Sequence, residues 1–381
     1  MPWPEVTVVS ARREFCALAR RPGANVSALC QRYGISRTTG YTWLARAEAG
    51  DDPAALVDRS RRPHTCPHRT DPTVEEQIVT LRDAHPTWGA RKLKRRLEDL
   101  GADDLPAVST ITAILARAGR RDLAQPVSRP WQRFEADAPN WLWQIDFTGH
   151  FALAAGRCHP LPVLDDHSRF LLGLTACANE QSATVQAILT TLFRRYGLPR
   201  KLLCDNGSPW GTTQGPHGLT ELGVWLVRVG VTPIHGRPFH PQTQGKLERV
   251  NRTLLADAVR PGGFATLGEA QRVFDRFRTV YNQERPHEAL GFATPLSRYT
   301  SSPRPFPEHL PPVAYAPGDA VRMVDASGRI QVRGRRWRVG HALAGQPVAL
   351  RPTAVDGVIE IRFCHLRIRE LDLRQEEDSA C

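Results

Sequence analysis

Apolar residues in the first 60 positions recur at the three- to four-residue spacing of short amphipathic helices. Ser27 is placed to cap one helix and Ser36 to cap a second, which ends near Glu48. Gly34-Ile35 between them marks a tight turn, so the pattern is typical of a helix-turn-helix. Gly40 departs from it, because a bulkier apolar residue often fills this inward position. We expect the second helix to present Arg37, Thr38, Thr39 and Thr42 to a major groove of DNA, with a small structural helical hairpin as the alternative.

A linker rich in arginine and proline follows these helices. It covers residues 56–64 and includes Arg61 and Arg62. This composition indicates an extended basic segment suited to following a polyanion. We therefore expect a first domain over residues 1–62, made of the helix-turn-helix and its linker.

Helical spacing then resumes in a second set of helices. It covers residues 74–85 and 90–100, and Ser109 is placed to cap a third helix. A charge run on a helix is usually only a solvated face, but two successive basic helical units favour contact with a polyanion. We expect a winged-helix-like unit over residues 63–125. The middle helix carries the cations Arg91, Lys92, Lys94, Arg95 and Arg96.

The pattern changes to strands beyond residue 130. Residues 141–150 alternate, and two short apolar runs at 161–164 and 169–176 flank a turn, which together indicate an antiparallel meander. Three antiparallel strands followed by alternating helices and strands give the order of an RNase H-like α/β fold, expected over residues 130–302. The later elements are expected at 181–196 (helix), 201–204 and 231–235 (strands), and 245–260 and 266–284 (helices).

The last segment, residues 313–373, consists of short β-rich runs separated by glycines. It predicts a small β-barrel. Trp337 and the neighbouring arginines would give this barrel a basic, partly aromatic face, although a purely structural barrel is the alternative. Those arginines are Arg333, Arg335, Arg336 and Arg338.

The charge balance favours nucleic acid as the partner of these segments. The 51 lysines and arginines against 39 acids give a net charge of +12, which suits the release of counterions from phosphates. A merely basic cytosolic protein is the alternative. Eight cysteines without a Cys-x-x-Cys pair suit a reducing cytoplasm, and no long uncharged apolar run indicates a membrane span.

Three acids lie where chemistry on phosphodiesters would need them. Asp146 is on the first expected strand, Asp205 comes just after the fourth, and Glu248 is near the start of a helix. Carboxylates that converge on one point hold the Mg²⁺ or Mn²⁺ ions used in phosphodiester cleavage. Each acid alone has an ordinary explanation, as a turn residue or as compensation for a helix dipole.

The motifs around these acids resemble the integrase-core transposases of bacterial insertion sequences, relatives of retroviral integrases that share an Asp-Asp-Glu site. The resemblance covers nearly the whole chain. It starts with the helix-turn-helix, Asp-Arg-Ser-Arg-Arg-Pro at 58–63 and Trp-Gly-Ala-Arg-Lys-Leu at 88–93, and continues with Trp-Gln-Ile-Asp-Phe-Thr-Gly at 143–149 and Asp-Asp-His-Ser-Arg at 165–169. It closes with Cys-Asp-Asn-Gly-Ser at 204–208, His-Pro-Gln-Thr-Gln-Gly-Lys-Leu-Glu-Arg at 240–249 and Tyr-Asn-Gln-Glu-Arg-Pro-His at 281–287.

The resemblance implies that Asp146, Asp205 and Glu248 are the catalytic acids and the ligands of two Mg²⁺ or Mn²⁺ ions. It also implies that Lys246 contacts a DNA phosphate, and we expect Arg249 of the same motif to bind DNA. The partners would be the terminal inverted repeats of a mobile element and its target DNA, bound by a homodimer or larger assembly. A bacterial cytoplasmic protein that associates with the nucleoid is expected.

One departure and two alternatives stay open. Asp205 and Glu248 are 43 positions apart, somewhat more than is usual in these enzymes. The extra residues fit the glycine-rich loop 211–218, and loops of this kind accept insertions at low cost. The alternatives to a transposase are a catalytically silent DNA-binding repressor and an RNase H-like nuclease without strand transfer. Loss of an acid would favour the repressor, but all three are present.

Overall fold

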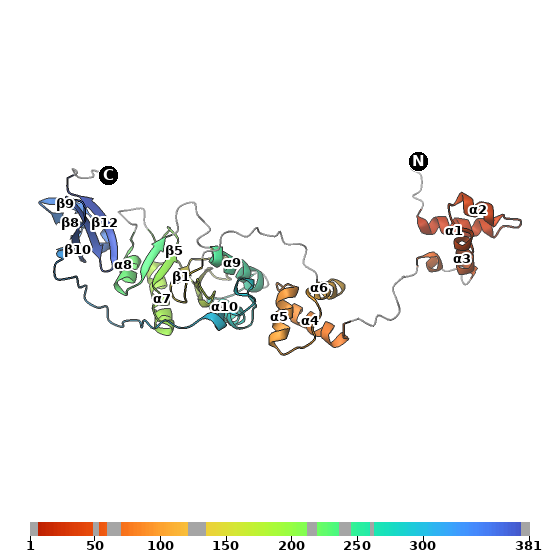
Figure 1. Cartoon of the computed structure of the whole chain (residues 1–381), viewed down its shortest axis with the longest axis horizontal. Coiled ribbons are helices and arrows are strands. Elements are labelled where there is room, and N and C mark those ends of the chain that lie inside the picture. The colour runs from red at the N-terminus through yellow and green to blue at the C-terminus, as the bar shows by residue number, and fades with distance from the viewer. Residues whose placement is uncertain are drawn as a thin grey trace. The chain divides into compact units, whose positions relative to one another are not determined.

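The structure is a computed structural model that describes residues 7–48, 53–58, 70–120, 135–211, 219–235, 245–259 and 263–374. The chain divides into two compact units, residues 1–69 and 70–381, and Figure 1 labels their helices and several of their strands. Arg61, Arg62 and most of the glycine-rich loop lie outside the described residues. No helix in the described part of the chain is long and apolar enough to cross a membrane.

The first unit is a three-helix cluster. Its helices are α1 (Val8–Ala19), α2 (Val26–Arg32) and α3 (Arg37–Glu48), with a short 3₁₀ helix at Pro53–Leu56. Ser36 caps α3 as predicted, because its hydroxyl accepts the N–H of Thr39 at 3.1 Å. The prediction for Ser27 is wrong. The side chain of Asn25 caps α2 by accepting the N–H of Ala28 at 3.1 Å.

Gly40 is buried on the inner side of α3, and the structure explains why no larger residue stands there. A Cβ atom at this position would lie 2.5 Å from Sγ of Cys30 and 3.0 Å from Cζ of Phe15. Both side chains are fully buried in the same cluster. The side chains of Phe15 on α1 and Cys30 on α2 therefore already fill the space that a larger residue at position 40 would need.

The second unit begins with helices α4 (Pro72–Ala84), α5 (Ala90–Asp99) and α6 (Val108–Arg117), which pack around Ile78, Trp88 and Leu93. Ser109 does not cap α6 as predicted. It lies inside the helix, and Ala107 occupies the cap position without a side-chain hydrogen bond.

Beyond these helices lies a six-stranded mixed sheet that carries the predicted order of elements. β1 pairs antiparallel with β3, β3 pairs antiparallel with β4, and β5 and β6 extend the other side of β1 in parallel. The expected strand 141–150 is shorter than predicted, so Asp146 lies one residue after it. The strands are β1 (Leu142–Ile145), β2 (Phe151–Ala152), β3 (Arg157–Asp165), β4 (Leu171–Cys177), β5 (Lys201–Cys204) and β6 (Thr232–His235).

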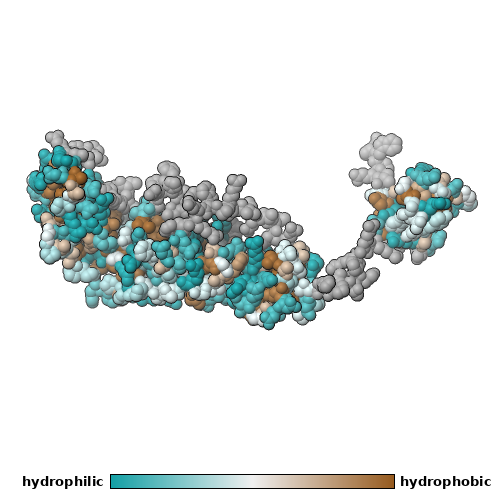
Figure 2. Space-filling view, in the orientation of Figure 1, coloured by the Kyte–Doolittle hydropathy of each residue, from teal (hydrophilic) through white to brown (hydrophobic). Residues whose placement is uncertain are grey.

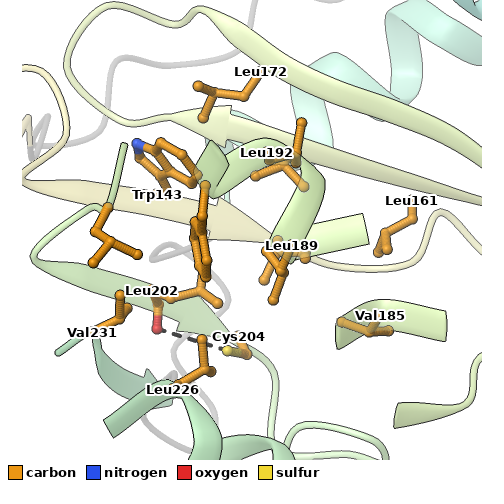
Figure 3. Packing of buried hydrophobic residues seen from close by; sticks show 14 of the residues in the cluster. Trp143, Leu161, Leu172, Val185, Leu189, Leu192, Leu202, Cys204, Leu226 and Val231 are labelled. Atoms are coloured by element: carbon orange, nitrogen blue, oxygen red, sulfur yellow. Dashed lines mark hydrogen bonds between the residues drawn. The ribbon is translucent and has the colours of Figure 1, made fainter. Parts of the chain in front are cut away.

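Among the described residues, two large hydrophobic clusters involve this sheet, each with its own pair of helices, and a third, smaller one contains Leu142 and Leu203. α7 (Ser182–Tyr196) and α8 (Glu221–Arg228) form one cluster with β1, β3, β4 and β5, and Figure 3 shows its side chains. α9 (Gly245–Leu254), which continues as a π-helix at Leu255–Val259, and α10 (Leu267–Gln283) form the other. The alternation of strand side chains divides the two clusters, since Val163 belongs to the first and Leu164 to the second.

The C-terminal part contains a four-stranded antiparallel sheet in the order β12-β11-β10-β7 and a separate hairpin of β8 and β9. Among the described residues no strand pairing joins the two into a closed barrel, so the barrel stays a prediction. Trp337 is buried in the core of this part, which contradicts the expected aromatic face. The strands are β7 (Ala320–Met323), β8 (Arg329–Val332), β9 (Arg335–Arg338), β10 (Pro347–Pro352), β11 (Val358–Phe363) and β12 (Leu366–Asp372).

Hydrophobic residues on the visible surface are scattered among hydrophilic ones (Figure 2).

Val224 and Val227 of α8 pack in the same cluster as the C-terminal strands. The helix that covers the central sheet therefore also supports the C-terminal part.

The packing around Gly40 generates a prediction. Gly40→Ala is expected to lower the amide-exchange protection of α3, because overpacking costs about 1–3 kcal/mol and the gain in helix propensity is about 1 kcal/mol. Removing Sγ in the double variant Cys30→Ala/Gly40→Ala should restore most of the protection. Hydrogen exchange of residues 37–48 in the full chain measures both. Higher protection in Gly40→Ala alone would contradict this packing.

Candidate active site

Two of the three predicted acids come together because β1 and β5 run in parallel. The paired residues include Trp143 with Leu202 and Gln144 with Leu203. Continuing that register by two positions sets Asp146 beside Asp205, just past the ends of their strands. Neighbouring strands lie about 4.8 Å apart, so two carboxyl groups meet at one edge of the sheet.

Both acids have pKa values above their ordinary range. Burial, followed by the negative charge of Asp205, raises the pKa of Asp146 to about 6. Burial also raises the pKa of Asp205, which the N–H of Gly207, donated at 3.1 Å, and His235 partly offset. In the described part of the chain, neither carboxylate forms an ion pair. Two half-buried acids that have no ion-pair partner among the described residues form a site that favours a cation.

Glu180 is a third acid near this edge that the sequence analysis did not single out. It precedes α7, and its negative charge contributes to the raised pKa of both Asp146 and Asp205. Oε1 of Glu180 lies 2.7 Å from Nδ1 of His159 on β3. The residue follows no motif, so only the folded structure identifies it.

The side chain of Glu248 does not join Asp146 and Asp205 in this structure. Its side chain is 67% exposed and pairs with Arg252, one helical turn along α9, at 3.1 Å. The described residues contain no group of three or more His, Cys, Asp or Glu side chains arranged to hold a metal ion. The structure thus brings together Asp146 and Asp205 but not Glu248.

The helix that carries Glu248 is nevertheless tied to the segment that carries Asp146. Oγ1 of Thr148 donates to Oδ1 of Asn251 at 2.8 Å. Thr148 lies two residues after Asp146, and Asn251 lies three residues after Glu248, on a neighbouring side of the helix. This hydrogen bond keeps the two segments adjacent.

Lys246, expected to contact a DNA phosphate, is engaged inside the protein. Its Nζ lies 2.5 Å from Oδ2 of Asp166, and that carboxylate is completely buried. Burial lowers the pKa of Lys246. The turn 165–168, interpreted from the sequence as a simple hairpin turn, is therefore the centre of a buried polar network.

The other residues expected to bind DNA differ in exposure. Burial, followed by the charge of Arg285, lowers the pKa of Lys92 to about 8, so Lys92 is poorly placed to meet a phosphate. Arg61 and Arg62 lie outside the described residues. The exposed members of the set are Arg37, Thr38, Thr42, Arg91, Arg249 and Arg335.

The donor set at the sheet edge fits a divalent cation. Both groups are carboxylates, which are the oxygen ligands that Mg²⁺ and Mn²⁺ prefer. Burial is the main cause of their raised pKa values, the negative charge of Asp205 adds to that of Asp146, and a bound cation would favour the ionised form of both carboxyls.

The effect of Asp205 on the pKa of Asp146 can be measured directly. Because the charge of Asp205 raises the pKa of Asp146, Asp205→Asn should shift the pKa of Asp146 down from about 6, toward its ordinary value. Carboxyl ¹³C resonances followed against pH in the metal-free protein give this pKa. Glu308→Gln, at an exposed ion pair with Arg194, is the matched control and should leave it unchanged. An unchanged pKa of Asp146 in Asp205→Asn would show that the two acids are not adjacent.

Sequence comparisons agree with this arrangement of parts. Two integrase core domain families match residues 136–241 and 229–295, and the C-terminal domain of IS481 family transposases matches residues 319–379. A helix-turn-helix domain matches residues 12–64, and a homeodomain-like domain matches residues 39–115.

Similar proteins come from insertion elements. An uncharacterized 39.2 kDa protein of insertion element IS476 from Xanthomonas euvesicatoria is 26% identical over 275 residues, which are 70% of this chain and 75% of that protein. A transposase of IS904 from Lactococcus lactis is 25% identical over 45% of this chain and 66% of its own length. A solved simian T-cell lymphotropic virus intasome, in complex with a PP2A regulatory subunit, has a chain that is 17% identical with a TM-score of 0.38, covering 77% of this chain and 99% of that chain.

The family matches occur in the order of the folded parts, from helix-turn-helix through integrase core to the C-terminal domain. With the insertion-element relatives, they support one conclusion: the chain is similar, part by part, to the insertion-sequence transposases that have an integrase core.

Proposed function

We propose that this transposase cuts the ends of its mobile element and joins them to target DNA, with Asp146, Asp205 and Glu248 as the catalytic acids. The observation that carries the proposal is the meeting of Asp146 and Asp205 at one edge of the sheet, where both have raised pKa values. The insertion-element relatives support transposition as the process that this site serves.

The three acids would hold two Mg²⁺ or Mn²⁺ ions. When bound, such ions stabilise the attacking and leaving oxygens of a phosphodiester. Asp146 must be ionised to act as a ligand, and the carboxyl keeps its proton up to a pH of about 6 in the metal-free protein. The adjacency of Thr148 and Asn251 supports the assignment of Glu248, because it keeps α9 beside the strand end that carries Asp146.

Glu248 would have to leave Arg252 to join the other two acids. That release would free a guanidinium beside the site, and Arg249 on the same helix is exposed. Arginine binds phosphate oxygens through a planar fork of N–H donors. We therefore infer that the exposed arginines of α9 hold the DNA backbone at the reacting phosphodiester.

The reaction would proceed in two steps at the same site. Water first attacks the phosphorus at the element end, a new phosphorus–oxygen bond forms, and the bond to the 3′ oxygen breaks to leave a 3′-hydroxyl. That hydroxyl then attacks a phosphodiester of the target DNA and displaces its 3′ oxygen. Since two ends must be joined together, at least a dimer would act, with the helix-turn-helix binding the terminal repeats.

Cleavage and joining of end-labelled DNA test the proposal. With Mg²⁺ or Mn²⁺ the full chain should give nicked ends and joined products. Asp205→Asn and Glu248→Gln should each lower both by about 10³-fold or more, the scale of a lost catalytic group. Asp137→Asn, an exposed acid outside the site, is the control and should keep full activity.

The other outcomes select the alternatives. DNA binding without any cleavage would indicate a silent repressor and would overturn the proposal. Cleavage without joined products would indicate a nuclease. Full activity in Glu248→Gln would remove Glu248 from the catalytic set, and Glu180, whose charge acts on both aspartates, would be the next acid to replace.

A further inference from the structure

Asp166 is a buried carboxylate that the proposed chemistry does not use. It is completely buried, and its oxygens accept three hydrogen bonds. The donors are the backbone N–H of Ala136 at 2.7 Å, Nε2 of Gln144 at 2.7 Å and Nζ of Lys246 at 2.5 Å. A buried charge is costly unless it is paired and hydrogen-bonded, and here both conditions are met.

Two of the three partners of Asp166 lie on β1, which ends one residue before Asp146, and on α9, which carries Glu248. Gln144 lies on β1, two residues before Asp146, and Lys246 lies on α9, two residues before Glu248. The backbone strengthens the link, because the N–H of Asp166 donates to the carbonyl of Leu142 at 2.9 Å. The side chain of Asp166 therefore joins Gln144 of β1 to Lys246 in the first turn of α9.

This link fixes how α9 is rotated about its own axis. Successive residues of an α-helix are about 100° apart, so Glu248 lies about 200° around the helix from Lys246. With Lys246 held on Asp166, Glu248 is held on the far side from that carboxylate. Thr148 and Asn251 form the second tie, beyond the end of β1. Two ties along one helix define both its rotation and its place along the strand.

Buried ion pairs add little net stability, because the loss of hydration offsets much of the attraction. Their best-supported use is to select one arrangement over others. Lys246 keeps a short contact to a carboxylate that solvent does not reach, and its side chain is only 18% exposed. It is therefore poorly placed to bind a DNA phosphate at the same time.

We propose that Asp166 is a positioning residue, which acts through Lys246 to hold α9 so that Glu248 can join Asp146 and Asp205. The proposal rests on the proposed function for the role of Glu248. It also replaces the expected phosphate contact of Lys246 with an internal one.

Three variants of the full chain test it: Asp166→Asn, Lys246→Met and the double variant that carries both. Each should lower the cleavage rate roughly 100-fold, because a misplaced catalytic group costs about that much. Each should also raise the Mn²⁺ concentration for half-maximal cleavage, and should lower the amide-exchange protection of residues 245–254 about tenfold. DNA affinity, measured by fluorescence anisotropy, should stay within about twofold of the unaltered protein.

The double variant distinguishes two explanations for a loss of activity: that the ion pair positions α9, or that each single variant leaves one buried charge without a partner. If the single variants fail only because one buried charge lacks a partner, the double variant should recover its activity, and the proposal would be wrong. If Lys246 binds phosphate, both variants that lack it should lose DNA affinity. In a plot of the logarithm of DNA affinity against the logarithm of salt concentration, the slope of these two variants should then be shallower by about one unit. Asp166→Asn should bind DNA normally. That result would also overturn the proposal.

A control and a second readout keep the two proposals distinct. Glu308→Gln removes the exposed ion pair with Arg194 and should change none of these quantities. If the unaltered protein shows no cleavage, the proposed function fails. The exchange protection of α9 still decides whether Asp166 holds that helix. Unchanged protection in all three variants would show that it does not.

Discussion

The parallel pairing of β1 with β5 is the constraint on which the rest of the site depends. The register of these two strands sets Asp146 beside Asp205, although 59 positions separate them in the sequence. The pairing requires a crossover through β3, β4 and α7, and the hydrophobic side chains of α7 and α8 hold the two strands from one face (Figure 3). Burial near this edge raises the pKa of both acids and favours a cation as their partner.

A second constraint acts on helix α9, which carries Glu248. α9 packs on the other face of the sheet through Leu247, Val250 and Leu254, but apolar contacts leave a helix free to slide or turn slightly. Two polar contacts limit that freedom: Lys246 with Asp166, and Asn251 with Thr148. Between them stands Glu248, exposed and paired with Arg252. The scaffold thus determines where α9 lies, and the proposed function requires the side chain of Glu248 to leave Arg252 and turn toward the other acids.

The sequence predicted the elements whose signals are local. Lys201–Cys204 is a strand with the predicted bounds, because a short apolar run lies between polar neighbours. β3 begins at Arg157, earlier than predicted, since Pro160 and Pro162 interrupt the strand pattern. Serine favours the cap position, and Ser27 and Ser109 were predicted as caps for that reason. Each nevertheless lies inside its helix, because α2 begins at Val26 and α6 at Val108. Such boundaries depend on packing, which a local pattern does not contain.

The site was predictable to the extent that motifs mark it. The motifs identified Asp146 and Asp205 as candidates, and the strand register places them together. Three features could not be predicted, because they depend on contacts between distant residues. These are the nearness of Glu180, the ion pair of Lys246 with Asp166, and the burial of Trp337 in the C-terminal core. A charged residue such as Lys246, within a motif expected to contact DNA, gives no sign in the sequence alone that its partner is inside the protein.

The central claim is that Asp146, Asp205 and Glu248 meet around divalent cations when DNA is bound. Anomalous diffraction from crystals of the protein with its element-end DNA and Mn²⁺ tests it most directly. The account predicts manganese peaks between the carboxylates of Asp146 and Asp205, with Glu248 turned from Arg252 to become a ligand. Manganese bound elsewhere on the protein, or Glu248 still paired with Arg252 beside bound DNA and metal, would contradict it.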